Sequence, residues 1–260
     1  MDMKKKTLES NKPNETNNTN LKIFHMNIDK SDNYLTERIN SIIYNIQLLN
    51  PDIICLHEIK SSIYQNIIQS LENYVGFQVF NTNKEDYGSC IFISKEIKII
   101  EPYFYDYEKL TDINARLLGC EIELRCGKIL HILTTQLEND IRKNEQFITV
   151  NNIINSNNTK SNFYILTIDA QCNNDEIINN KFNELTDAWK MMGCPSKIKN
   201  TSRNGIRPDR IFYSEKFNIV SMSLECMSSV KDIKDVKENK DIIINPSKNY
   251  GLFVILELEN

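Results

Sequence analysis

The stretch at residues 53–58, IICLHE, constrains the fold of this chain more than any other. Five apolar or weakly polar residues run without a turn signal after the helix-stopping Pro51, which is typical of a short strand buried on both faces. Such strands occur in α/β proteins, where the carboxyl ends of strands carry the chemistry. Glu58 stands at that end, and a buried carboxylate is costly unless it is paired or bound to a cation. For a single glutamate, a solvated loop start is the alternative.

A strand and a helix precede this stretch. Residues 21–27 predict a strand, and residues 35–49 predict an amphipathic helix with its apolar residues on one stripe. A β-α-β order implies that the two strands are parallel within one sheet. We therefore expect Asn27, Asp29 and Glu58 to meet at one edge of that sheet.

The rest of the chain alternates shorter strand and helix signals. We expect strands at residues 77–80, 89–94, 97–100, 115–124, 128–135, 163–168, 210–214 and 250–258, and helices at 62–73, 140–155 and 182–192. Charges alternate over residues 231–241, which predicts an exposed excursion. Residues 1–20 have little to bury and predict a disordered tail ahead of one domain at 21–260. Two mixed sheets packed face to face, with helices outside, would bury these elements.

Composition excludes several classes of function. The formal net charge of −4 argues against a general polyanion binder, so nucleic-acid contact requires a local basic patch. The 7 cysteines are odd in number and form no Cys-x-x-Cys pair, which favours free thiols in a reducing, intracellular compartment, nuclear or cytoplasmic. The first residues lack the apolar core of a signal peptide, and no run approaches a membrane span. We expect no membrane partner, and a monomer.

Four predicted strand ends carry oxygen-bearing side chains. They are Asn27 and Asp29, Glu58, Asp169 and Gln171, and Asp209. Each of these positions alone is weak evidence for a site, because loops after strands are commonly polar. Together, carboxylates and amides at separate strand ends provide what a hard divalent cation and a phosphate need.

The order and spacing of these motifs resemble the endonuclease/exonuclease/phosphatase family. The motifs are NID at 27–29, LHE at 56–58, TTQLE at 134–138, DAQ at 169–171, RPDRIF at 207–212 and PSKNYGL at 246–252. Four stretches, NID followed by LTER at 35–38, NPDII at 50–54, DAWKMMG at 187–193 and 207–212, resemble the tyrosyl-DNA phosphodiesterase 2 branch, which removes tyrosine from DNA 5′ ends. The match covers about residue 21 to the end and implies an α/β (α+β) fold, a four-layer α-β-β-α sandwich.

The resemblance also implies an activity and a site. The family hydrolyses phosphodiesters by in-line water attack with Mg²⁺ or Mn²⁺. Its catalytic positions fall on Asn27, Asp169, Gln171 and Asp209, its substrate-binding positions on Arg116 and Ser202, and its metal positions on Glu58 and Asp29. Arg116 matches only loosely, and a surface arginine is the alternative. The implied partner is a nucleic-acid 5′ end, as single-stranded DNA or a protein–DNA adduct.

The chain departs from the family at the proton-handling positions. Gln136 and Asn249 stand where the family has histidines, Lys248 where it has aspartate, and Gln171 where it has asparagine. Losing one donor aimed at the transition state costs about 10²–10³ in rate, so we expect an impaired or inactive enzyme. None of the chain's three histidines stands at a catalytic position, and we interpret His57 as a hydrogen-bonded strand residue.

Lys248 leads to a specific hypothesis about metal binding. Its ammonium would repel Mg²⁺ and neutralise Glu58 and Asp29, so we expect weak or absent metal binding with the Lys248 nitrogen in place of the ion. A solvated lysine is the alternative. Asp209, without its histidine partner, can pair with Arg207 or Arg210. For function, the alternatives are an impaired phosphodiesterase, a non-catalytic module that binds a nucleic-acid end or a protein through the former active-site cleft, and, more distantly, a small-phosphoester enzyme.

Overall fold

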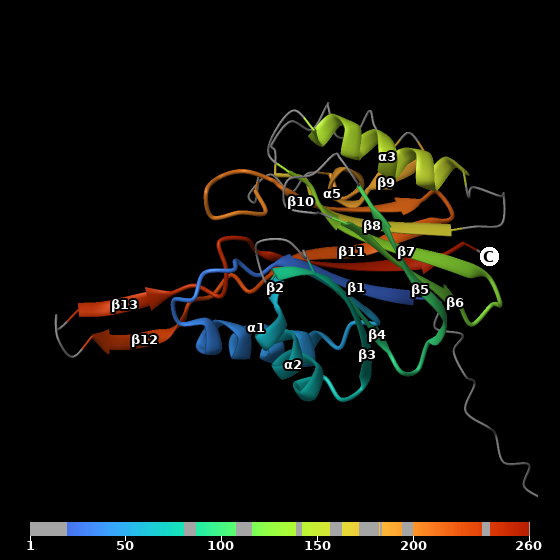
Figure 1. Ribbon diagram of the computed structural model, residues 1–260. Coiled ribbons are helices and arrows are strands. Elements are labelled where there is room, and N and C mark those ends of the chain that lie inside the picture. Colours follow the sequence, from blue (N-terminus) through green and yellow to red (C-terminus); the bar gives the residue numbers. More distant parts are fainter. Residues whose placement is uncertain are drawn as a thin grey trace, which may run out of the picture.

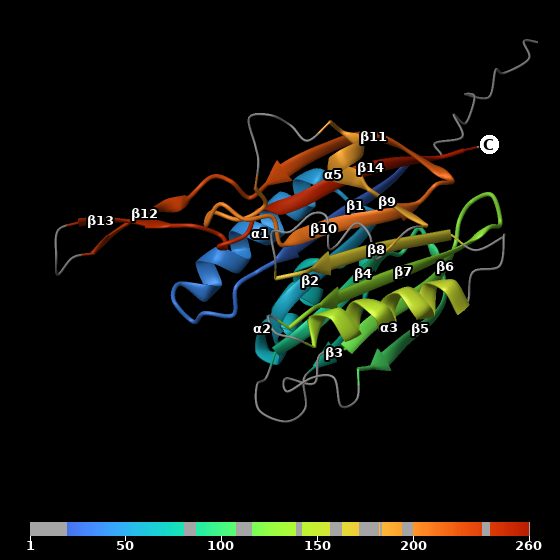
Figure 2. The same ribbon diagram turned by 90° about the horizontal axis from the view of Figure 1, so that it is seen from above.

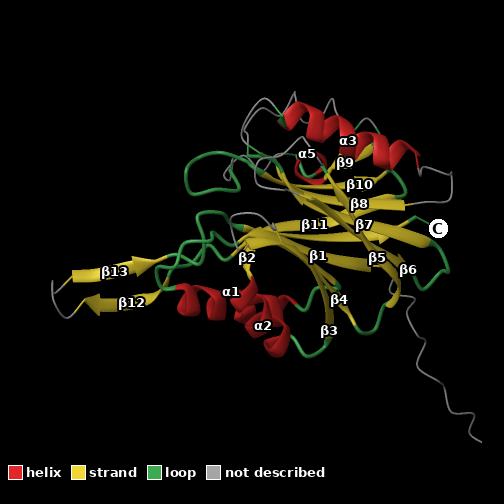
Figure 3. Cartoon of the chain, viewed as in Figure 1, coloured by secondary structure: helices red, strands yellow, loops and turns green. Residues whose placement is uncertain are grey.

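The computed structural model describes residues 20–80, 87–107, 116–138, 142–156, 163–171, 182, 184–193, 200–235 and 240–259, with the side chains of 231–235 and 240–242 left aside. Over these residues, two six-stranded mixed sheets lie face to face with helices on their outer sides (Figure 1). The expected four-layer α-β-β-α sandwich is confirmed, and Figure 3 shows its layers by type of element. Of the predicted tail at 1–20, all but Asn20 lies outside the described residues.

The first sheet carries the β-α-β unit. Its strand order is β11 (Phe217–Glu225), β14 (Gly251–Leu258), β1 (Asn20–Asn27), β2 (Ile53–Lys60), β4 (Tyr87–Ser94) and β3 (Tyr74–Phe80). Strands β1 and β2 are parallel, with Asn27 beside His57. Helices α1 (Leu35–Leu49) and α2 (Ser61–Ser70) cover the outer face. Helix α1 ends at Asn50 in left-handed backbone, one residue before Pro51, as the sequence predicts.

The second sheet supplies the other half of the site. Its strand order is β5 (Lys98–Asp106), β6 (Arg116–Glu123), β7 (Ile129–Gln136), β8 (Phe163–Asp169), β10 (Asp209–Ser214) and β9 (Leu185–Asp187). Strands β7 and β8 are parallel and align Gln136 with Asp169, while antiparallel β10 aligns Asp209 with Asp169. The predicted β6–β7 hairpin forms, with its turn at Gly127. Helix α3 (Lys143–Ser156) covers the outer face, as Figure 2 also shows.

Strand periodicity explains the three apolar cores. Successive side chains of β1 point to opposite faces, so Ile23 packs between the sheets and Phe24 packs under α1 and α2. Leu166 of β8 lies in the third core, together with Phe147 of α3. Because strands β1, β2, β7 and β8 are buried on both faces, their polar residues are confined to the strand ends and to a few positions between the sheets.

Two predicted elements near the C-terminal half were wrong or incomplete. The helix expected at 182–192 is strand β9 followed by the short helix α5 (Ala188–Met191), because residues 185–187 pair with β10 and Asp187 caps α5 by accepting from the Trp189 N–H. The excursion expected at 231–241 is a hairpin of β12 (Val230–Asp235) and β13 (Lys240–Ile244) that projects from the body in Figures 1 and 2. The sequence reading also missed edge strand β11.

The cysteines and helices bear on two further expectations. Cys55, Cys90, Cys120, Cys126 and Cys226 are free thiols, as expected, while Cys172 and Cys194 lie outside the described residues. In the part of the chain that the structure describes, no helix has the length and apolarity to cross a membrane.

Candidate active site at the strand ends

Polar side chains from both sheets converge where the parallel strands end. Gln136 Nε2, at the end of β7, donates to Glu58 Oε1 of β2 at 2.8 Å and to Asp169 Oδ2 of β8 at 3.3 Å. Asn27 Nδ2, at the end of β1, donates to Asp169 Oδ2 at 2.7 Å, and Gln171 Nε2 donates to the same oxygen at 2.6 Å. We name these five residues the carboxylate–amide cluster. Asn27 and Asp169, which are hydrogen-bonded within it, are 142 positions apart in sequence.

The same local turn follows two of these strands. Asn27 Oδ1 accepts the Asp29 N–H at 2.9 Å, and Asp169 Oδ1 accepts the Gln171 N–H at 3.1 Å, so each strand ends in an Asx-type turn. Asp29 and Gln171 take left-handed backbone there, with φ of 59° and 48°. Glu58 does the same, with φ of 60°, at a bulge of β2 against β4. These turns redirect the chain so that the side chains face the junction of the two sheets.

Asp169 is the electrostatic centre of the cluster. Its side chain is fully buried, and burial, together with the nearby Asp209 carboxylate, raises its pKa to about 7. Hydrogen bonds from Asn27 and the Gln171 N–H oppose this rise. Asp169 is therefore partly protonated at neutral pH, and three amide groups already donate to its Oδ2.

Asp209 lies one strand away and is also buried. Its Oδ2 accepts from Thr201 Oγ1 at 3.3 Å, and its Oδ1 lies 3.4 Å from His25 Nε2. Burial raises the pKa of Asp209 well above its ordinary value and lowers that of His25 to about 4, so both side chains favour their neutral forms. Of the two arginines predicted as partners of Asp209, Arg207 Nη2 contacts Asp187 Oδ2 at 2.9 Å, and Arg210 Nη1 lies 3.6 Å from the same oxygen.

His57 is a structural residue, as the sequence indicated. Its ring is buried between the sheets, where Nδ1 contacts Ser89 Oγ at 2.8 Å and Nε2 contacts Thr134 Oγ1 at 3.2 Å. Burial, and the neighbouring His25, hold the pKa of His57 well below its ordinary value. A neutral ring with both nitrogens engaged is not placed to replace a catalytic acid.

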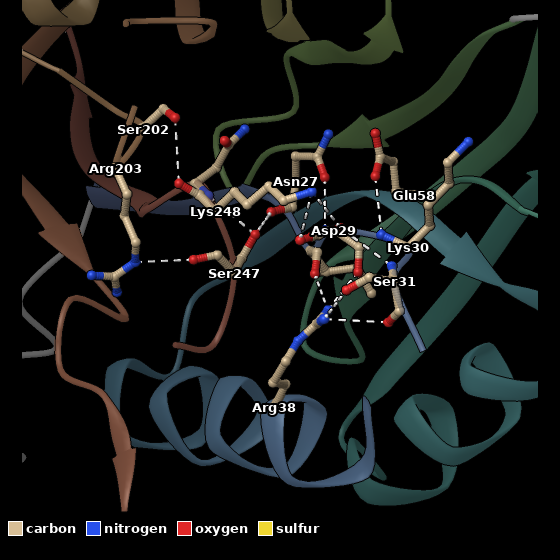
Figure 4. Close-up of polar contacts among 12 residues, drawn as sticks. Asn27, Asp29, Lys30, Ser31, Arg38, Glu58, Ser202, Arg203, Ser247 and Lys248 are labelled. Atoms are coloured by element: carbon tan, nitrogen blue, oxygen red, sulfur yellow. Dashed lines mark hydrogen bonds and ion pairs between the residues drawn. The ribbon is translucent and has the colours of Figure 1, made fainter. Parts of the chain in front are cut away.

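Lys248 reaches one of its two expected partners. Its Nζ lies 3.3 Å from Asp29 Oδ2 and 3.5 Å from Asp29 Oδ1 (Figure 4), although the lysine side chain is 68% exposed. The expected neutralisation of Glu58 is taken over by other groups, since Glu58 Oε1 accepts from Gln136 and Oε2 accepts the Lys30 N–H at 3.0 Å. Lys248 is thus both solvated and ion-paired.

The comparisons with known proteins agree with this geometry. No protein-family profile matches the sequence, and no curated protein matches it. Among solved structures, D. rerio TDP2 humanized by 14 mutations superposes with a TM-score of 0.78 at 19% identity, over 92% of this chain and 99% of that chain. D. rerio TDP2 complexed with single strand DNA product gives 0.74 at 17%, over 92% and 99%. An endonuclease/exonuclease/phosphatase family protein from Bacteroides thetaiotaomicron gives 0.76 at 15%, over 92% and 98%.

The chain has the endonuclease/exonuclease/phosphatase fold. At these identities the likeness establishes the fold and not the activity. The resemblance drawn from the motifs is confirmed at the level of the fold.

A divalent metal, which this fold family implies, fits the residues poorly. Each Glu58 oxygen already accepts an N–H, and the Asp29 carboxylate is paired with an ammonium. Mg²⁺ requires oxygen ligands in near-octahedral geometry, and a neighbouring cation opposes a second positive charge. Among the residues that the structure describes, no three His, Cys, Asp or Glu side chains are arranged to hold a metal ion.

The implied substrate-binding residues, Arg116 and Ser202, contact residues outside the carboxylate–amide cluster. Arg116 begins β6, and its guanidinium pairs with Asp106 and stacks over Phe104 at 5.1 Å. Ser202 forms an isolated bridge with Asn249 and donates from Oγ to Lys248 O at 3.3 Å. Arg116 thus links β6 to β5, and Ser202 links its segment to residues 248–249.

Two lysines of the site region, Lys30 and Lys143, were not predicted from the sequence. Lys30 lies with Nζ 4.0 Å above the Tyr87 ring, and Lys143 Nζ donates to Gln171 O at 3.1 Å. Together with Lys248 they supply the local positive charge that the net charge of −4 does not. Only the position of Lys30, next to Asp29, could have signalled this, because Lys143 belongs to α3 and reaches the cluster through the fold.

Proposed function

We propose that this protein is a divergent relative of 5′-tyrosyl-DNA phosphodiesterases that recognises a nucleic-acid 5′ end at the carboxylate–amide cluster and hydrolyses its phosphodiester slowly or not at all. One observation carries the proposal. Gln136, at a position where the family has histidine, directs its amide inward to Glu58 and Asp169. A donor engaged with two carboxylates is withdrawn from the phosphoryl oxygens that it would otherwise stabilise.

The remaining proton-handling groups support the same conclusion. Asp169 has a pKa of about 7 and three amide donors on one oxygen, so only part of the protein carries the ionised base at neutral pH. Asp209, with a raised pKa, faces His25 in place of the family's final histidine. An amide at Asn249 cannot carry positive charge. The residues retain polar contacts suited to binding, while the charged donors of catalysis are replaced.

Three lysines in and next to the site, Lys30, Lys143 and Lys248, support recognition of a phosphate. Lys143 Nζ donates to Gln171 O, Lys248 Nζ pairs with Asp29, and Lys30 follows Asp29 in the chain. Lysine contacts to phosphate position a nucleic acid without reading its sequence. The solved TDP2 complex with single strand DNA product is the precedent on this fold for such a ligand. We propose single-stranded DNA, or a protein–DNA adduct, as the partner, within a reducing intracellular compartment that suits the five free thiols.

A turnover assay tests the catalytic half of the proposal. The native protein receives a single-stranded oligonucleotide with a 5′-phosphotyrosyl group and Mg²⁺ or Mn²⁺, beside Asp169→Asn and beside the triple variant Gln136→His, Lys248→Asp and Asn249→His. We expect little or no turnover by the native protein and a gain in the triple variant. Fast native turnover that Asp169→Asn abolishes would show an intact enzyme and overturn the proposal.

A binding assay tests the recognition half. Native protein should bind a 5′-phosphorylated oligonucleotide more tightly than its 5′-hydroxyl counterpart, and Lys248→Met should weaken that preference. Lys98→Met is the matched control, because Lys98 is 71% exposed and ion-paired with Glu123, yet lies at the opposite end of the second sheet. Equal affinity for both oligonucleotides would leave a protein partner as the alternative occupant of the site.

A further inference from the structure

Arg38 is a buried arginine whose guanidinium contacts loops next to the carboxylate–amide cluster. It lies in the first turn of α1 and is only 5% exposed. Its guanidinium donates to four carbonyl oxygens and one hydroxyl: Pro246 O at 3.1 Å, Ser31 O at 3.2 Å, Ser31 Oγ at 2.6 Å, Ile28 O at 2.7 Å and Asp29 O. These contacts satisfy all five N–H donors that a guanidinium carries.

The acceptors belong to two segments that are far apart in sequence. Residues 28–31 follow β1 and carry Asp29, while Pro246 directly precedes Ser247 and Lys248. Figure 4 shows Arg38 beside Asp29, Ser31 and the Ser247–Lys248 segment. Arg38 therefore binds the backbone on both sides of the Asp29–Lys248 ion pair. A buried arginine that bridges two loops through its planar fork fixes their separation, which a lysine with one nitrogen cannot reproduce.

The Lys248 segment is also held from its other side. Arg203 Nε donates to Ser247 O at 3.0 Å, and the Arg203 N–H donates to Lys248 O at 2.9 Å. With Arg38 on Pro246 O, three successive carbonyls, at residues 246–248, each accept a hydrogen bond. The backbone that carries Lys248 is thereby fixed, so the ammonium extends from a rigid base. Arg203 has no such contact with residues 28–31, which makes it a comparison for Arg38.

We propose that Arg38 is a positioning residue that sets the distance between Asp29 and Lys248 and so presents the Lys248 ammonium to a bound phosphate. The ligand half of this inference rests on the proposed function, and the loop geometry does not. Arg38 also brings a buried positive charge close to Asp29 and Glu58. Burial lowers the pKa of Arg38, and the two carboxylates oppose this shift because they favour the charged guanidinium.

Hydrogen exchange without any ligand tests the loop geometry. In Arg38→Lys, amides at 28–31 and 247–249 should exchange about tenfold faster, because charge-assisted hydrogen bonds are lost, while amides of strand β2 stay unchanged. In Arg203→Lys, only the amides of residues 247–249 should exchange faster. Ile46→Val, on the buried face of the same helix, controls for general loss of stability and should leave both loops unchanged. Unchanged exchange at 28–31 in Arg38→Lys would overturn the proposal.

A double-mutant cycle tests the coupling to ligand. Arg38→Lys should weaken binding of the 5′-phosphorylated oligonucleotide about tenfold in the native background and less than about twofold in Lys248→Met, because Arg38 acts through Lys248. Equal effects in both backgrounds would show a merely structural role. If the native protein binds no oligonucleotide, the proposed function fails, and the exchange experiment still decides the role of Arg38.

Discussion

The Lys248 ammonium lies 3.3 Å from Asp29 Oδ2, so a lysine and an aspartate form an ion pair at a position where the fold family is expected to hold a divalent ion. The lysine side chain is exposed to solvent, so the ion pair contributes little to the free energy of unfolding. Its importance lies in the charge that it brings to the site.

Replacing Lys248 should change metal affinity. We expect the native protein to bind Mg²⁺ or Mn²⁺ no more tightly than about millimolar, and Lys248→Asp to gain at least about tenfold, because a cation is exchanged for an oxygen ligand. Isothermal titration calorimetry measures both. In the Lys248→Asp background, Glu58→Gln should remove the gain. Tight binding by the native protein would contradict the expectation.

Asp169 should make stability depend on pH. Its pKa is about 7 in the folded protein and 3.8 ordinarily. Its contribution to the free energy of unfolding is therefore fully present below about pH 4 and is lost as pH rises through 7. His25, with a pKa lowered to about 4, acts in the opposite direction, since its contribution is present above 6.5 and lost as pH falls through 4. Comparison with Asp169→Asn isolates the first effect. The native protein should lose on the order of 2–4 kcal/mol relative to the variant between pH 4 and 8.

Chemical denaturation across this pH range measures the difference. Parallel profiles for the native protein and Asp169→Asn would contradict a raised pKa at this position. The buried Asp209 titrates in the same direction as Asp169, so a residual slope in the variant is expected.

Removing the Gln136 amide should destabilise the protein. Gln136→Met keeps the size of the side chain but removes the donor to Glu58 Oε1 and one of the three donors to Asp169 Oδ2, at a cost of about 1.5–3 kcal/mol in the free energy of unfolding. Gln78→Met, at an exposed position of β3, is the matched control and should change stability by less than about 0.5 kcal/mol. Equal effects of the two substitutions in urea denaturation would exclude a stabilising role for the amide.

His57 should matter for stability and not for binding. His57→Leu leaves Ser89 Oγ without its partner and removes one contact of Thr134, at a cost of about 1–3 kcal/mol. Affinity for the 5′-phosphorylated oligonucleotide should be unchanged once the protein is shown to be folded. Lys248→Met should give the reverse profile, with reduced affinity and native stability. Loss of affinity in folded His57→Leu would assign His57 a role at the ligand.

Local patterns predicted most of the fold. Helix α1 and strand β2 were found because an apolar stripe, a proline and a buried run mark them without help from the rest of the chain. The error at residues 182–192 arose because helical spacing there is outweighed by pairing of residues 185–187 with β10, a contact that depends on tertiary structure. Strand β11 was missed because it lies half-exposed at a sheet edge with little periodicity.

The site was predictable only as a set of positions. Parallel pairing of β1 with β2 brings Asn27 and Glu58 to one edge, and that followed from the β-α-β order. Which amide reaches which carboxylate could not follow, because Gln136 bridges Glu58 and Asp169 across two sheets. Arg38 was noted only as part of the LTER stretch at 35–38, and its burial was not predicted, since a helical arginine is ordinarily solvated.

The left-handed backbone at Asp29, Glu58 and Gln171 has a consequence for how this chain can change. Each such conformation costs a residue with a side chain about 1 kcal/mol relative to glycine. Glycine at Glu58 or Gln171 would relieve this backbone cost, but it would also remove the hydrogen bonds with Gln136 and Asp169, which outweigh it. The side-chain contacts of the ligand site thus hold the strand ends in a conformation that the backbone alone disfavours, so random substitution at these positions should loosen the turns as well as the site.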